Sequence, residues 1–291
     1  MKVLVTGGQG QLALSLLERV RRRPEIELVA IGRPNLDLEI PGSAASVIAS
    51  ITPDVVINAA AYTAVDQAED EVDRAVRINA EAAGEIAVAA ARVGAPVVQV
   101  STDYVFDGNA QQPFAEEAAT NPLNVYGRSK LEGERHVRSG NPKHAIVRTS
   151  WVYSPFSTNF VRTMMELAET REKLTVVDDQ RGSPSSALDL ADGLLRMLEV
   201  GGAESGEIYH LAGTRSTSWC GFAREVMTER RRRGLRVPLL EAISSEEWPT
   251  QAKRPRNSVL DSSKFARDFG YWMPELHASL AEVIGRLADQ R

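Results

Sequence analysis

Several features that often reveal function are missing from this sequence of 291 residues. It has a single cysteine, Cys220, which excludes an internal disulfide. The four histidines form no pair at helical spacing and no cysteines cluster, so the sequence carries no metal-site signature and we expect no bound metal. No stretch approaches the roughly 18 consecutive apolar residues of a transmembrane helix, so we expect no membrane span.

An excess of positive charge is also missing. The formal net charge of -5 argues against binding to nucleic acid or to an anionic membrane surface. Two locally basic runs, at 19–23 and 230–233, lie near the ends of expected helices, where positive side chains suit the helix dipole, so we interpret them as solvated faces. The opening residues, MKVLVTGG, break their apolar run too early for a signal peptide, and we expect a cytoplasmic protein.

The sequence does contain a regular alternation of strand-like and helix-like segments in its first half. We expect strands at 2–6, 27–31, 54–58, 96–100 and 145–148, and helices at 11–23, 43–51, about 70–93 and 125–138. This alternation predicts an α/β fold in which a doubly wound parallel sheet has helices on both faces. After Ser150 the alternation loosens, which predicts a smaller C-terminal lobe that closes over the carboxyl edge of the sheet.

The segment TGGQGQLA, residues 6–13, joins the first expected strand to the first expected helix. Gly7 permits a tight turn, Gly10 lets a pyrophosphate approach the N–H groups of the helix N-terminus, and Ala13 allows close packing of helix and strand. We therefore predict a dinucleotide site that includes Gly7, Gly10, Gln11 and Leu12; the alternative is a merely structural turn. On this basis we expect an NAD(P)-binding domain over 1–150 and a mainly substrate-binding lobe over 151–291, which can return segments to the sheet.

The second expected strand ends without the acidic residue that usually binds the adenosine ribose. It reads Ala30-Ile31-Gly32-Arg33-Pro34, so Gly32 leaves room for a 2′-phosphate and Arg33 can pair with it. This favours NADPH over NADH, although NADH stays possible and Arg33 can also be a solvent-facing turn residue. We expect two further groups of cofactor contacts: Asp37 and Leu38 at the adenine, and Ala61, Tyr62 and Thr63 along the middle of the cofactor. The small residues at 61–63 can instead reflect helix packing.

Two polar motifs follow at intervals along the chain. VSTDYVFDG, residues 100–108, follows an apolar strand and places Thr102 and Asp103 at its carboxyl end, where ligands bind in open α/β sheets. YGRSK, residues 126–130, puts Tyr126 and Lys130 on one face of a helix, and we expect the lysine charge to lower the pKa of the phenol. The alternatives are a polar capping loop and a pair of surface residues.

Together these motifs resemble the extended short-chain dehydrogenase/reductase family and, more closely, the dTDP-4-dehydrorhamnose reductases within it. The similarity covers essentially the whole chain, in GGQGQLA, PDVVINAAAYTAVDQAE, VSTDYVFDG, PLNVYGRSKLEGE, RTSWVYSPFSTNF, DDQRGSPSS and RPRNSVLD. The resemblance implies a Rossmann-type fold and NADPH-dependent reduction of the C4 keto group of a dTDP-linked 4-keto-6-deoxysugar, dTDP-4-dehydro-L-rhamnose. Ser15 departs from members with a glutamate there that serves a magnesium-linked dimer, which leaves a monomer or a homodimer open.

The resemblance also implies roles for individual residues. Thr102 and Tyr126 would contact the keto sugar, Lys130 would hold the nicotinamide ribose and tune Tyr126, and Asp103 and Trp151 would bind the sugar. Related dehydratases carry an Asp-Glu pair after the threonine, and Tyr104 cannot replace that glutamate, so reduction is favoured over dehydration.

The second half of the substrate requires an anchor in the C-terminal lobe. Arg254 and Arg256 can grip a diphosphate, although arginines beside prolines are often merely exposed. Two alternatives to the rhamnose reaction remain open from sequence: a reductase of another nucleotide-linked 4-keto-6-deoxysugar, and a noncatalytic subunit similar to the regulatory partner of methionine adenosyltransferase.

Overall fold

The structure, a computed structural model, describes residues 1–289, and its centre is a parallel sheet of six strands. The order is β10-β5-β4-β3-β1-β2, and each neighbouring pair is parallel. The strands are β1 (Lys2–Thr6), β2 (Glu27–Ile31), β3 (Val55–Asn58), β4 (Val97–Thr102), β5 (His144–Thr149) and β10 (Ile208–His210). The chain runs outward from β1 to β2 and then crosses to β3, so the strand order reverses between β1 and β3, which is where such sheets bind nucleotides. The expected doubly wound α/β fold is confirmed.

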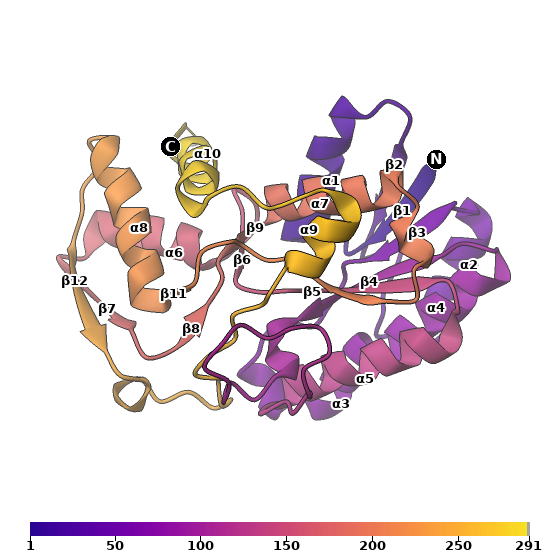
Figure 1. The fold of residues 1–291 in the computed structure, drawn as a ribbon, viewed down its shortest axis with the longest axis horizontal. Helices are drawn as coiled ribbons and strands as arrows, with labels where there is room; N and C mark the ends of the chain where they lie inside the picture. Colours follow the sequence, from indigo (N-terminus) through magenta and orange to yellow (C-terminus); the bar gives the residue numbers. More distant parts are fainter. Residues whose placement is uncertain (290–291) are drawn as a thin grey trace.

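Helices cover both faces of the sheet because successive residues of each apolar strand point to opposite sides (Figure 1). Val3 and Val5 pack against α1 and α7, whereas Leu4 packs against α2 and α4. The sheet helices are α1 (Gln11–Arg19), α2 (Ser43–Ile51), α3 (Val72–Val76), α4 (Ala82–Arg92), α5 (Val125–Gly140), α7 (Ala187–Glu199) and α9 (Ser263–Phe269). The long α5 lies on the same face as α4 and brings its first turn to the carboxyl edge of the sheet.

A second, smaller body is formed by the C-terminal half of the chain, at the left of Figure 1. Its helices α6 (Phe160–Thr170), α8 (Trp219–Arg232) and α10 (Leu276–Asp289) enclose their own apolar core. Its strands form three pairs: β7 (Lys173–Val177) with β12 (Leu239–Ile243), β8 (Arg181–Gly182) with β11 (Thr217–Ser218), and β6 (Val152–Tyr153) with β9 (Ser185–Ser186). The same half of the chain also supplies β10 and α7 to the central sheet and its helix layer.

Three element boundaries differ from the expectation from sequence. The helix expected at 11–23 ends at Arg19 and continues as a 3₁₀ turn, η1 (Val20–Arg22). The helix expected at about 70–93 is divided by a π-helical segment, η3 (Arg77–Glu81), between α3 and α4. The strand expected to end at Val100 runs on to Thr102, because pairing with β5 continues to Thr149. Thr102 is therefore held by the sheet itself rather than by a loop.

Residues 1–289 contain neither a membrane-spanning helix nor a cluster of metal ligands. None of their helices has both the length and the apolar character needed to cross a membrane. Within the same range, no group of three His, Cys, Asp or Glu side chains is arranged to hold a metal ion. Ser15 is fully buried and its hydroxyl donates to the Gln11 carbonyl 2.8 Å away.

Candidate active site

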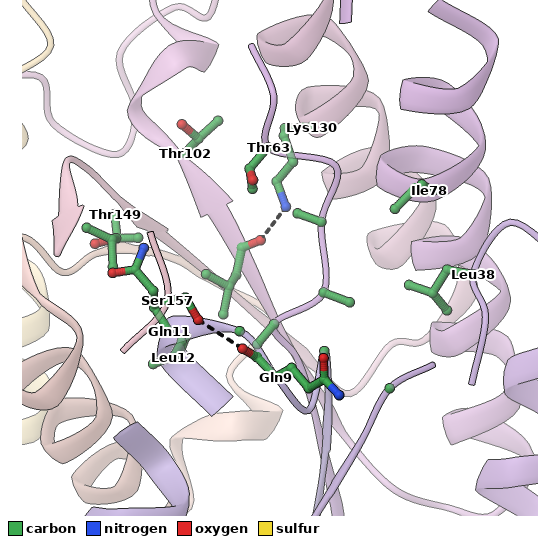
Figure 2. A pocket seen from close by; sticks show the side chains of 18 of the residues that line it. Gln9, Gln11, Leu12, Leu38, Thr63, Ile78, Thr102, Lys130, Thr149 and Ser157 are labelled. Carbon is green, nitrogen blue, oxygen red and sulfur yellow. Dashed lines mark hydrogen bonds between the residues drawn. The ribbon is translucent and has the colours of Figure 1, made fainter. Parts of the chain in front are cut away.

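A cleft of about 590 Å³ lies along the carboxyl ends of the central strands. Its walls come from the loops after β1, β2, β3, β4 and β5 and from the first turns of α1 and α5 (Figure 2). The cleft brings together most of the residues singled out from sequence: Gly7, Gly10, Gln11, Leu12, Arg33, Asp37, Leu38, Ala61, Thr63, Thr102, Asp103, Tyr126, Lys130 and Trp151. Tyr62, Arg254 and Arg256 do not line it.

The glycine loop has the geometry that a pyrophosphate requires. Gly7 has φ +82° and its carbonyl accepts a 2.7 Å hydrogen bond from the Gly10 N–H. Gly10 is the N-cap of α1 and supplies no side-chain cap, so the N–H groups of the first helical turn remain available to an anion. Gly8, which was not singled out from sequence, matters as well. A Cβ there would lie 3.2 Å from the Gly32 nitrogen, so the glycine at this position lets the loop after β1 touch the loop after β2.

The end of the cleft where we expect the adenosine contains a carboxylate, that of Glu39, in addition to Asp37. Glu39 lines the cleft beside Arg33, although it lies beyond the strand end where sequence reasoning looked for an acid. Its Oε1 is 3.5 Å from a guanidinium nitrogen of Arg33 and 2.8 Å from one of Arg74. The Arg33 side chain is 67% exposed, so it is free to reorient toward a ligand.

The loop after β3 places its three candidates differently. Ala61 and Thr63 line the cleft, whereas Tyr62 is buried outside it. The Tyr62 hydroxyl donates to Glu71 at 3.2 Å and the Arg74 guanidinium lies 5.5 Å from the centre of its ring. The side chain of Tyr62 therefore serves packing against the α3 region.

The other end of the cleft holds the polar cluster that the two sequence motifs predicted to meet. Thr102, at the end of β4, and Tyr126, in the first turn of α5, both line this end of the cleft, and the Thr102 side chain acts to lower the pKa of the Tyr126 phenol. The Thr102 hydroxyl also contacts the Asp103 carboxylate at 3.1 Å. Lys130 is 3% exposed, and its Nζ donates to the Val100 carbonyl at 2.7 Å, the upper dashed line in Figure 2.

The helix that carries Tyr126 can approach this closely because of the residue beside it. A Cβ on Gly127 would lie 2.2 Å from the carbonyl oxygen of Tyr104, so any larger residue would push α5 away from the loop after β4. The Asn124 side chain caps α5 by accepting the Gly127 N–H at 2.7 Å. The sequence N-V-Y-G thus fixes both the start of the helix and its distance from Thr102.

The expected effect of Lys130 on Tyr126 is wrong for this structure. Burial raises the pKa of Tyr126 to about 12, and the effect of the nearby Thr102 side chain only partly opposes that rise. Burial also lowers the pKa of Lys130 to about 8, against the opposing charge of Glu134. The ammonium group is directed to the Val100 carbonyl instead of the phenol, so desolvation decides both values.

Asp103 and Trp151 also line the cleft. Asp103 is 3% exposed, burial raises its pKa to about 7, and among residues 1–289 its Oδ2 has no hydrogen-bond partner. Trp151 adopts φ +47°, a strained value for a bulky residue, and its ring stacks on Trp219 with centroids 3.6 Å apart. Trp219 was missed from sequence because it lies far along the chain, with no motif around it.

The two arginines expected at a substrate diphosphate do not line the main cleft. Arg254 makes a bidentate ion pair with Asp66, in which Nη1 lies 3.0 Å from Oδ1 and Nη2 lies 2.6 Å from Oδ2. This pair forms because residues 251–254 lie against the loop that follows β3. Arg256 lines a separate groove together with Arg181. Neither side chain reaches the main cleft.

A glycine loop, a strand-end threonine and a Tyr-Lys pair on one helix, together on a doubly wound sheet, define a nucleotide-dependent oxidoreductase of the short-chain dehydrogenase/reductase class. Comparison with known proteins gives the family: the chain belongs to the family described as RmlD substrate binding domain, whose model matches residues 1–288.

Individual relatives agree. A dTDP-4-dehydrorhamnose reductase of Sinorhizobium fredii is 44% identical over 291 residues, which cover 99% of this chain and 98% of the relative. The solved dTDP-4-dehydrorhamnose reductase of Clostridium acetobutylicum superposes with a TM-score of 0.91 at 38% identity and covers 99% of this chain and 100% of its own. That of Bacillus anthracis, solved in complex with NADP, has a TM-score of 0.90 at 35% identity, with 97% and 98% covered.

Proposed function

We propose that this chain uses NADPH to reduce the C4 keto group of dTDP-4-dehydro-L-rhamnose, giving dTDP-L-rhamnose. The observation that supports this most is that Thr102, Tyr126 and Lys130 line the same cleft as the glycine loop. Full-length relatives at 37–44% identity are dTDP-4-dehydrorhamnose reductases. The reaction is oxidoreduction, and the chain works as a cytoplasmic enzyme, either monomer or homodimer.

The residues of the cleft fit the cofactor. Gly7, Gly10, Gln11 and Leu12 hold the pyrophosphate, with the uncapped N–H groups of α1 as donors. Arg33 pairs with the 2′-phosphate, and Asp37, Leu38, Ala61 and Thr63 line the adenosine and the middle of the molecule. When bound, NADPH supplies the hydride. Residues 1–150 thus carry the cofactor, and residues 151–291 mainly shape the sugar-nucleotide side through Trp151.

The proton comes from the protein. Because the pKa of Tyr126 is raised to about 12, its phenol is protonated at neutral pH and can donate to the developing alkoxide on C4. Thr102 donates a second hydrogen bond to that oxygen as its charge grows. Lys130 holds the nicotinamide ribose, and the buried Asp103 carboxyl, with one oxygen unpartnered, receives a sugar hydroxyl.

The direct test is a reduction assay with the purified chain. Given NADPH and dTDP-4-dehydro-L-rhamnose, it should oxidise one NADPH for each dTDP-L-rhamnose formed, followed by the absorbance of the reduced nicotinamide and by identification of the product. The absence of oxidation with any 4-keto sugar nucleotide would overturn the proposal in favour of a noncatalytic nucleotide-binding role.

Cofactor preference is expected to depend on Arg33. Arg33→Ala should weaken NADPH binding about 10-fold, because a charge-assisted pair with the 2′-phosphate is lost, and should leave NADH binding unchanged. Fluorescence titration of both nucleotides measures the ratio, with the exposed Arg92→Ala, on α4, as the control. Equal affinity losses for the two nucleotides would contradict the assignment.

NADPH affinity is also expected to depend on pH. Because the pKa of Lys130 is lowered to about 8, its amine is charged below that pH and becomes neutral above it, where the hydrogen bond to the ribose weakens. The dissociation constant for NADPH should therefore rise as the pH increases through about 8, as measured by titration at closely spaced pH values. A constant value from about pH 6 to about pH 10 would contradict a role for Lys130 at the ribose.

A further inference from the structure

The face of α5 that carries the catalytic pair continues inward to a third charged residue. Tyr126, Lys130 and Glu134 are spaced four apart, so they lie one turn below another on the same side of the helix. Tyr126 and Lys130 border the cleft, whereas Glu134 is 2% exposed and does not line it. The function proposed above gives Glu134 no role.

Glu134 is nevertheless fully engaged with the strands under the cleft. One of its oxygens accepts the Ser101 hydroxyl at 2.6 Å and Arg148 Nε at 2.9 Å, and the other accepts Arg148 Nη2 at 2.7 Å. Ser101 and Arg148 are 4% and 2% exposed. The three groups thus form a closed network of β4, β5 and α5 that water does not reach.

This network and Lys130 hold two consecutive residues of β4. Lys130 binds the Val100 carbonyl, Glu134 binds the Ser101 side chain, and the next residue is Thr102. The two bonds fix the end of β4 against α5 at the part of the cleft that Thr102 and Tyr126 line together. A shift of one of these elements against the other would change the separation of these two side chains directly.

The charge of Glu134 also acts on Lys130. Of the other ionisable groups in this region, Tyr126 lies on the same helix and is acted on by Asp103 on the turn after β4, and the charge of Arg148 on β5 is paired with Glu134. On the packed segment η3, Arg77 and Glu81 pair with each other at the surface. Glu134 is the negative group that raises the pKa of Lys130 against the effect of burial. A buried ion pair is costly compared with apolar packing, so its presence here calls for a use beyond stability.

We propose that Glu134 is a positioning residue of the reductase site, which aligns Thr102 with Tyr126 through Ser101 and supplies the negative charge that keeps Lys130 an ammonium. The alignment of Thr102 with Tyr126, which is measured by kcat, rests on the proposed function. The effect of Glu134 on the charge of Lys130 is measured by NADPH binding alone.

Two variants of Glu134 test the alignment and the charge together, and Ser101→Ala tests the alignment alone. Glu134→Gln removes the charge, and the double variant Glu134→Gln with Arg148→Met also removes the counter-charge that would otherwise be left buried. In both we expect the pH at which NADPH binding weakens to fall by about one unit or more below its wild-type value near 8, and kcat to fall about 10-fold with KM for the sugar nucleotide changed less than threefold.

Ser101→Ala deletes a single hydroxyl and should lower kcat about threefold to 10-fold without moving the pH midpoint, because it removes alignment but no charge. Glu132→Gln is the matched control: it lies on the same helix, but its carboxylate pairs with Arg135 and His136 at the surface. It should leave both quantities unchanged. Circular dichroism establishes that each variant is folded.

The proposal is overturned if the pH midpoint stays at the wild-type value in a folded Glu134 variant, or if Ser101→Ala retains kcat within twofold. Ser101→Ala decides the matter alone if neither Glu134 variant folds. A shifted pH midpoint in a protein that reduces no 4-keto sugar would instead count against the proposed function and leave the link between Glu134 and Lys130 standing.

Discussion

Replacing Tyr126 with Phe is expected to slow turnover by about 10²- to 10⁴-fold, the usual contribution of a positioned general acid. The variant keeps the ring and its edge-to-face contact with Tyr104, at 5.8 Å between centroids, so the fold should be unaffected. NADPH binds through the glycine loop at the other end of the cleft, and its affinity should stay within about twofold of wild type. Steady-state kinetics and fluorescence titration measure the two quantities separately.

Tyr104→Phe is the matched control for this prediction. It also deletes a phenol hydroxyl whose pKa is raised by burial, from a ring in contact with Tyr126, but from a side chain that does not line the cleft. We expect its turnover to stay within about threefold of wild type. Near-normal turnover in Tyr126→Phe, or an equal loss in Tyr104→Phe, would remove Tyr126 from the mechanism.

The fold was predictable from sequence because its strands and helices are separated by recognisable turn sequences. Apolar strands such as KVLVT and VVIN are short and β-branched, and each is followed by polar turn residues and an amphipathic helix. The bounds of these strands in the structure agree with the expected ones to within one or two residues. The carboxyl end of β4 was harder to place, since Ser101 and Thr102 are polar and only the pairing with β5 keeps them in the strand.

The site was predictable where a local motif carries the geometry. The glycine loop, the strand-end threonine and the Tyr-Lys pair each depend on neighbours within a few residues, and all line the cleft. Contacts between distant parts of the chain were not predictable. Arg254 is held by Asp66 on the loop after β3, and Trp151 rests on Trp219 within the C-terminal half; both contacts depend on the tertiary fold.

The direction of the pKa shift of Tyr126 could not be predicted from sequence. Helical spacing places Lys130 and Tyr126 on one face, and that alone suggested a lowered phenol pKa. Which effect dominates depends on burial and on where the ammonium points, and both require the three-dimensional structure. With Lys130 Nζ bonded to the Val100 carbonyl, the phenol remains a protonated donor, which is the state that ketone reduction needs.

Lys130→Met is expected to lower turnover by about 10²-fold or more and to raise the dissociation constant for NADPH about 10-fold, a combination that Tyr126→Phe does not give. Met fills similar space and removes the 2.7 Å donor to the Val100 carbonyl, which keeps its bond from Gln99 Nε2 at 3.0 Å, so a loss of stability of only about 1 kcal/mol should accompany it. The decisive readout is pH: the variant should bind NADPH with the same weak affinity on both sides of pH 8, because the group that titrates there is gone. Lys143→Met, which removes an exposed lysine paired with Glu204, serves as the control and should retain the wild-type pH dependence. A Lys130→Met protein in which the affinity still falls above pH 8 would assign that titration to another group and separate Lys130 from the cofactor.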